Sequence, residues 1–153
     1  MAVFEGKNKI KSDDSNIKIN AKEYYGKIRV ICEEFELSAA LSVGDEILGP
    51  ELPQGAKIVD AVVKSDDMGA TGIFDLGIQE NIEGVITKNV NGLVGIADAG
   101  GQSVLKRADK DSNLIGAEVA EGLNKETLPL ITVTEATANA AGMIKIFIYL
   151  SVE

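Results

Sequence analysis

The sequence has no histidine and no tryptophan, and Cys32 is its one cysteine. Without histidine, Ser-His-Asp and Cys-His catalysis are excluded, as are the commonest zinc and iron ligand sets. A single cysteine excludes an intrachain disulfide and thiolate metal clusters, and it is typical of proteins made in a reducing cytosol. Because Cys32 stands among aliphatic neighbours, we expect a buried, unreactive thiol. No phosphate-binding glycine loop of standard spacing is present, so we expect no cofactor.

Long apolar runs are missing too. No run approaches the roughly 20 residues that span a bilayer, and the opening MAVFEGKNKIKSDD has no apolar core of signal-peptide length. The 153 residues, with 45% apolar content, suffice for one domain with its own core. We therefore expect a protein made in the cytoplasm, with no membrane partner.

Positive charge is scarce beyond the amino-terminal segment. Residues 1–29 carry seven Lys or Arg and four Asp or Glu, a net +3, and the remainder carries eight and twenty, a net −12, which together give −9. An acidic body repels nucleic acid, and the basic segment is too weak and too mixed to be a nucleic-acid arm. We expect no nucleic-acid partner, and we expect the segment to dock on an acidic neighbour.

Alternation with a period of two, which marks β-strands, is the commonest pattern. In MIKIFIYLSV, residues 143–152, every second residue is aliphatic and the others are mixed. Such a strand belongs inside a sandwich or at a subunit contact. KIRVICEEF, residues 27–35, likewise has Ile28, Val30 and Cys32 on one face.

Turn residues separate several alternating segments. Pro53-Gln54-Gly55 predicts a turn, and the alternating residues 56–64 and 71–76 after it are expected to form a hairpin. Val43-Gly44-Asp45 and Asn91-Gly92 predict two further turns.

Helix is scarce. Two short helices are expected, at residues 102–109 and 117–123, and further strands at residues 16–20, 84–90, 93–97 and 128–134. The fold class is therefore predicted to be all-β: an antiparallel β-sandwich, jelly-roll-like, with an extended N-terminal arm and little helix.

The arm is predicted to be residues 1–26, and the β-sandwich domain residues 27–153. The arm's apolar residues are isolated among lysines and polar residues, too few to pack a core. Ile17 and Ile19 alternate with polar residues, so this piece could add as an edge strand to a neighbouring sheet. The residues expected to contact another subunit are Phe4, Ile10, Ile17, Ile19, Tyr24 and Tyr25.

Carboxylates are plentiful but poorly arranged for catalysis. The adjacent pairs Asp13-Asp14, Glu33-Glu34 and Asp66-Asp67 point to opposite faces if they lie on strands. A glycosidase could assemble two carboxylates across strands, but sugar sites usually need aromatic platforms, and the aromatic content is only 5%. We predict that the protein is not an enzyme.

Four aspartates gather between residues 52 and 77: Asp60, Asp66, Asp67 and Asp75. Asp60 and Asp75 fall on alternating segments and the other two at a loop tip. They are expected to point in different directions, so this stretch is interpreted as scaffolding.

Asp109-Lys-Asp111-Ser-Asn113 begins like a calcium-binding loop, with oxygen ligands at alternate positions. Leu114 then stands where a glycine should make the sharp turn, and Ala120 where a bidentate Glu should close the site. We interpret the segment as a polar turn and predict no metal site.

Several short motifs resemble small structural proteins of tailed bacteriophages, particularly marine ones. They are LPQGA at residues 52–56, SDDMG at 65–69, FDLG at 74–77, ATA at 136–138 and GMI at 142–144. Residues 78–126 have no counterpart in this resemblance. The resemblance implies a β-sandwich virion component, such as a capsid decoration protein on the outer capsid surface, and it carries over no site residues because its motifs are turns and strands.

These observations together predict a virion structural protein, a capsid decoration or cementing protein made in the host cytoplasm. It would bind the major capsid protein and its own copies, as a homo-oligomer with a trimer as the expected form. The arm would contact another copy or the capsid. The alternative is a ligand- or glycan-binding sandwich module of a phage tail or fibre, which would need aromatics gathered in a groove or a metal in the Asp109 loop.

The polar-turn interpretation of the Asp109 loop predicts that calcium does not stabilise the protein. Millimolar calcium, or a chelator, should leave Tm unchanged to within about 2 °C, because an ion that does not bind the native state adds no stability. Differential scanning calorimetry measures this. A rise of many degrees with calcium would contradict the interpretation.

Overall fold

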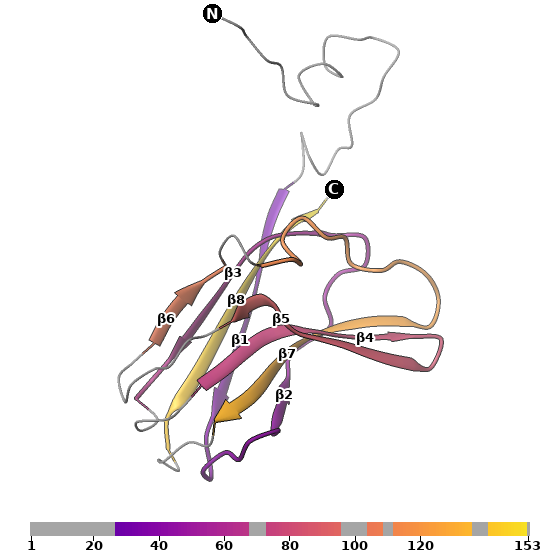
Figure 1. The fold of residues 1–153 in the computed structure, drawn as a ribbon. Coiled ribbons are helices and arrows are strands. Elements are labelled where there is room, and N and C mark those ends of the chain that lie inside the picture. Colours follow the sequence, from indigo (N-terminus) through magenta and orange to yellow (C-terminus); the bar gives the residue numbers. More distant parts are fainter. Residues whose placement is uncertain (1–26, 68–72, 96–103, 109–111, 136–140, 153) are drawn as a thin grey trace, which may run out of the picture.

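The computed structural model of the protein describes residues 27–67, 73–95, 104–108, 112–135 and 141–152 (Figure 1). These residues form eight β-strands and no helix. The strands are β1 (Lys27–Glu36), β2 (Glu46–Leu48), β3 (Lys57–Ser65), β4 (Ile73–Ile82), β5 (Val85–Gly95), β6 (Val104–Arg107), β7 (Lys125–Glu135) and β8 (Met143–Val152).

The strands make two four-stranded antiparallel sheets, with the orders β1-β8-β3-β6 and β2-β7-β4-β5. The chain passes from one sheet to the other at each connection except β4–β5, which is a hairpin. This order is that of a jelly roll. The predicted all-β sandwich is therefore confirmed. The predicted arm, residues 1–26, lies outside the described residues.

The core lies between the two sheets and follows the predicted alternation. On β8, Ile144, Ile146, Ile148 and Leu150 are at most 3% exposed. The inner residues of β3 and β4, such as Val63 and Phe74, pack in the same cluster. Each such side chain contributes about 1.5 to 3 kcal/mol when it is fully buried, so one aliphatic face per strand is enough to hold the sheets together.

The predicted hairpin of residues 56–64 and 71–76 is wrong. β3 pairs with β8 and β6, whereas β4 pairs with β7 and β5 in the other sheet. Both segments alternate as expected, because each buries one face. Alternation does not distinguish two strands that pair side by side from two strands that face each other across a core.

The predicted helices are also wrong. Residues 104–107 form β6, which pairs with Val62–Ser65 of β3. Residues 117–123 contain no helix, because their backbone bonds to the chain at the start of β3. The Ala117 carbonyl accepts from Ile58 N at 2.9 Å, and Val119 N donates to the Ala56 carbonyl at 2.8 Å. Tertiary hydrogen bonds override weak local propensity here.

Two predicted turns are confirmed and a third is not. Asp45 N donates to the Ser42 carbonyl at 3.0 Å, and Ala56 N donates to the Pro53 carbonyl at 3.3 Å, which closes the turns around Gly44 and Gly55. Asn91-Gly92, by contrast, lies inside β5, so Val85–Gly95 is one strand where two were expected, at residues 84–90 and 93–97. That strand bulges at this point, because Asn89 and Val94 pair with nearly adjacent residues of β4.

Cys32 is exposed rather than buried. Cys32 shares one face of β1 with Ile28 and Val30, and this face points away from the core. Ile31 and Phe35, on the opposite face of β1, pack against the core. Apolar neighbours in the sequence indicated burial, but the face that they share is the outer one.

Gly77 lets the bulged β5 approach β4 closely. A Cβ at Gly77 would lie 1.7 Å from the Asn89 carbonyl oxygen, whereas a Cβ at Gly95, in β5, would meet nothing nearer than an Asp75 oxygen at 4.0 Å. Neither glycine has a φ in the left-handed region. Gly77→Ala should therefore lower the free energy of unfolding by about 3 kcal/mol through overpacking against backbone.

Gly95→Ala is the matched control, and it should change that free energy by no more than about 0.5 kcal/mol. Urea unfolding of both variants measures the difference. Equal stability of the two variants would contradict the close approach at Gly77.

Candidate interaction surfaces

The sequence-predicted contact residues all lie in residues 1–26, outside the described residues. They are Phe4, Ile10, Ile17, Ile19, Tyr24 and Tyr25. The described chain begins where that segment ends, at Lys27 on β1, an edge strand of its sheet. The prediction that they contact another subunit stays a prediction.

The described residues contain no group of three or more His, Cys, Asp or Glu positioned to hold a metal ion. Asp109 and Asp111 lie outside the described residues, so the polar-turn interpretation stays a prediction. In the same described part of the chain, no helix is long and apolar enough to cross a membrane.

Two of the four aspartates of residues 52–77, Asp60 and Asp66, make separate structural contacts. Asp60 on β3 pairs with Arg107 on β6, and the Arg107 Nε–Asp60 Oδ2 distance is 2.6 Å. This hydrogen bond raises the pKa of Arg107 above its usual value. Asp66 accepts a hydrogen bond from the Met143 backbone N at 3.0 Å and so ties the end of β3 to the start of β8. These contacts support the scaffolding interpretation.

The outer face of the β1-β8-β3-β6 sheet gathers apolar side chains at its centre. Backbone pairing sets Val30 beside Tyr149, and Cys32 beside Phe147, which is in turn beside Val62. Val30 is 48% exposed, while Phe147 and Tyr149 are half-buried. We call this set, with Ile28 at its edge, the outer apolar face.

Ion pairs border the outer apolar face. Lys145 Nζ lies 3.0 Å from Glu34 Oε1 at one end, and this hydrogen bond raises the pKa of Lys145 above its usual value. The Asp60–Arg107 pair lies on the side toward β6. These paired charges leave the face almost neutral, although the chain carries −9.

A second apolar group lies at the tip of the β4–β5 hairpin, which projects beyond the β1-β8-β3-β6 sheet (Figure 1). Val85 and Ile86 are 64% and 56% exposed, and Leu123, in the segment before β7, is 90% exposed. Glu83 N donates to the Asn124 carbonyl at 2.9 Å and joins the tip to that segment. The tip is therefore a braced apolar projection.

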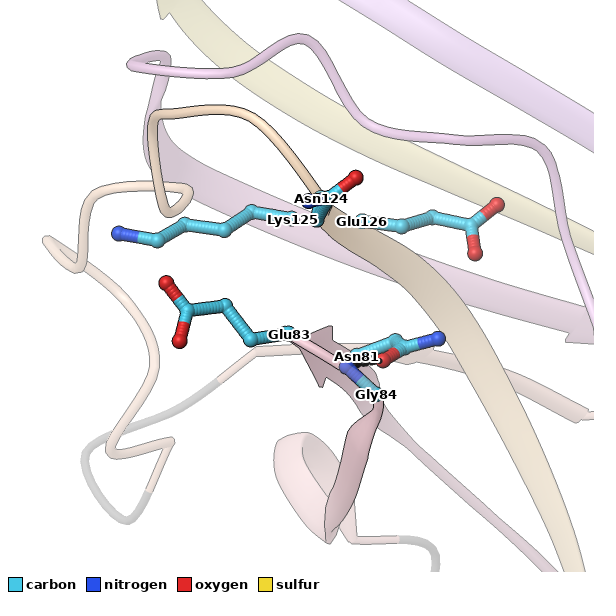
Figure 2. A pocket seen from close by; sticks show the side chains of 6 residues that line it. All are labelled: Asn81, Glu83, Gly84, Asn124, Lys125 and Glu126. Atoms are coloured by element: carbon cyan, nitrogen blue, oxygen red, sulfur yellow. Dashed lines mark hydrogen bonds between the residues drawn. The ribbon is translucent and has the colours of Figure 1, made fainter.

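A polar hollow of about 720 Å³ lies beside this tip (Figure 2). Figure 2 shows the side chains of Glu83 and Lys125 extending to one side while that of Glu126 points the other way. None of the residues that line the hollow is aromatic; they are Asn81, Glu83, Gly84, Asn124, Lys125 and Glu126. It therefore lacks the aromatic platform that a glycan site usually needs.

Sequence reasoning missed the outer apolar face as a surface, although its signal is present in the sequence. The mixed face of residues 143–152 suits a subunit contact, and Ile28, Val30 and Cys32 share a face of their own segment. Only the pairing of β1 with β8 brings these two sets together.

No protein-family model matches this chain, and no curated protein matches it in sequence. Phage capsid structures are among the solved structures that are similar in fold. A chain in the capsid asymmetric unit of cyanophage Pam1 is 18% identical with a TM-score of 0.59, covering 84% of this chain and 86% of that chain. A chain in the capsid of Ralstonia phage GP4 is 22% identical with a TM-score of 0.59, covering 82% and 85%. This chain thus has the fold of chains found in phage capsid structures.

Proposed function

We propose that this chain is a structural protein of a phage virion, a capsid decoration or cementing protein on the outer surface of the shell. The observation that carries the proposal is the fold similarity to chains of two phage capsid structures, which extends over more than four fifths of each chain compared. The motif resemblance to phage structural proteins supports the same role.

The protein acts by binding, with the major capsid protein and its own copies as partners and a trimer as the expected oligomer. Stable interfaces bury roughly 800 Å² on each partner, contributed by about 20 to 30 residues. The outer apolar face supplies only the centre of such a contact. Further surface must come from elsewhere, such as the hairpin tip, the sheet edges or residues 1–26.

Catalysis is not part of the proposal, since Asp60 and Asp66 hold strands together. The alternative, a glycan-binding module, gains no support from the polar hollow, which has no aromatic lining. We therefore favour virion attachment over glycan binding as the function of this chain.

The direct test is binding to shells assembled from the major capsid protein of the same phage genome. The purified protein should co-sediment with these shells and saturate at a fixed ratio to capsid subunits, because decoration sites repeat with the lattice. Serum albumin serves as the bystander control. Absence of saturable binding would overturn the proposed function.

A further prediction concerns the arm. Deleting residues 2–15 should leave the sandwich folded, because β1 begins only at Lys27, and should weaken oligomer or shell binding. The basic amino-terminal segment complements the acidic body in charge, which favours docking on another copy or a capsid subunit. Light scattering and co-sedimentation of full-length and truncated protein measure the effect.

The matched control replaces residues 2–15 with a Gly-Ser segment of equal length, which keeps the length and removes the side chains. It should behave like the deletion. If full-length and truncated proteins have the same oligomer mass and the same shell occupancy, the arm has no binding role.

A further inference from the structure

The four edge strands of the two sheets are β1, β6, β2 and β5, and β1 differs from the others. β2 and β6 are three and four residues long, and β5 carries the bulge. β1 has ten residues, no proline, and unbroken pairing with β8. Among the described residues only β8 pairs with β1, so the other side of β1 presents a row of backbone donors and acceptors, of which Glu34 N donates to Glu33 Oε1 at 2.9 Å. A long regular edge of this kind is a template for another strand.

Apolar side chains accompany this edge. Ile28 is 58% exposed and Val30 is 48% exposed, and Cys32 is exposed beside them. Proteins usually protect edge strands by making them short, bulged or interrupted by proline. β1 has none of these three protections. Its charged residues, which also discourage pairing with an unrelated strand, are of both signs, so they leave the edge open to a strand of complementary charge.

The charges of β1 indicate what covers it. Its first three residues include Lys27 and Arg29, and its last four include Glu33, Glu34 and Glu36. An antiparallel second copy of β1 would set each basic half against an acidic half, whereas a parallel copy would set like charges together. The edge is therefore complementary to itself.

We propose that β1 is a self-association edge: the β1 strands of two copies pair antiparallel about a two-fold axis at Ile31. The two β1-β8-β3-β6 sheets then become one eight-stranded sheet with a continuous outer apolar face. This inference rests on the part of the proposed function in which the protein binds its own copies.

The register follows from side-chain orientation. Directly opposite residues of an antiparallel pair point to the same side of the sheet, so outward residues must meet outward residues. With the axis at Ile31, Arg29 lies opposite Glu33 and Val30 opposite Cys32, each twice. Ile28 then lies opposite Glu34, whose carboxylate keeps its contact with Lys145.

The neighbouring register is less favourable. An axis at Cys32 would place Val30 opposite Glu34 and Ile31 opposite Glu33, and Ile28 opposite Glu36. Three aliphatic residues would then meet carboxylates, where the axis at Ile31 leaves only Ile28 in that position, and Arg29 would lose its partner. An axis at Val30 would set Lys27 opposite Glu33, but it would pair only residues 27–33, whereas the axis at Ile31 pairs residues 27–35. The charge pattern and the length of the pairing together therefore select the axis at Ile31.

Two-fold pairing is compatible with a trimer. A trimer uses contacts between two different surface patches, whereas a two-fold contact uses the same patch on both copies. β1 would then join copies that belong to neighbouring trimers, which is the kind of link that a cementing protein needs.

A disulfide tests the register. Directly opposite residues have Cα atoms about 4.5 to 5.5 Å apart, within the range that a disulfide spans. Val30→Cys, with the native Cys32 retained, should give a covalent dimer under mild oxidation. The wild type should give much less, because its two Cys32 residues are diagonal neighbours, about 7 to 8 Å apart.

The control is V30C/C32S, which should also give little dimer, because its two thiols, both at position 30, are diagonal neighbours as well. Non-reducing gel electrophoresis reads the result, and circular dichroism verifies that each variant is folded. If V30C forms no more dimer than V30C/C32S while light scattering shows an intact oligomer, the β1 pairing is overturned, and residues 1–26 or a shell subunit cover this edge.

Charge reversal gives a second test on the full chain. Arg29→Glu or Glu33→Arg should each weaken self-association about tenfold, because each places like charges opposite one another twice. R29E/E33R should restore it by reversing the pair. Lys64→Glu makes the same charge change as R29E at an exposed site on β3, away from the edge, and should have little effect.

Sedimentation equilibrium measures these dissociation constants. A double variant that is not restored, or an equal loss in K64E, would overturn the pairing. Wild-type protein that is monomeric at every concentration would overturn the self-binding in the proposed function as well, whereas its shell binding is decided separately by co-sedimentation.

Discussion

The rest of the structure depends on the burial of one face of β8. This strand pairs with β1 along its whole length and with β3 from Lys57 to Ser65. Its inner residues are almost completely buried; they are Ile144, Ile146, Ile148 and Leu150. A slip of one residue would turn all of them to the outside, so one hydrophobic face determines the register of three strands.

The same two-residue alternation along β8 creates the outer apolar face, which we consider functional. Phe147 and Tyr149 alternate with the buried isoleucines, and the pairing of β1 and β3 with β8 extends their apolar row across the sheet. The Glu34–Lys145 and Asp60–Arg107 pairs neutralise its border. On a chain of net charge −9, this is a surface where two copies meet little repulsion.

The second sheet has a different shape. Because Gly77 has no side chain, the backbone of β5 can lie close to it. The register of the β4–β5 pairing shifts at this position, between Leu76 and Ile78. Lys88 on β5 reaches Glu46 on β2, with Nζ 2.7 Å from Oε2, although these strands are opposite edges of the sheet. This sheet is therefore strongly curved, and its hairpin tip projects, while the β1-β8-β3-β6 sheet presents a regular edge.

The sequence by itself determined the all-β class, the terminal strand with its buried face, and the turns at Gly44 and Gly55. These depend on neighbours within a few residues, through alternation and turn chemistry. The absence of histidine also excluded whole classes of catalysis on composition alone.

The tertiary structure decided how strands partner, and with that the candidate surface. Residues 56–64 and 71–76 belong to opposite sheets, residues 104–107 are a strand, and Cys32 faces outward. A local pattern shows that a strand has an apolar face, but not which partner lies beside it or which face meets the core. Those choices are made by pairs distant in sequence, such as β1 with β8, because only their combined burial and hydrogen bonding separate one topology from another.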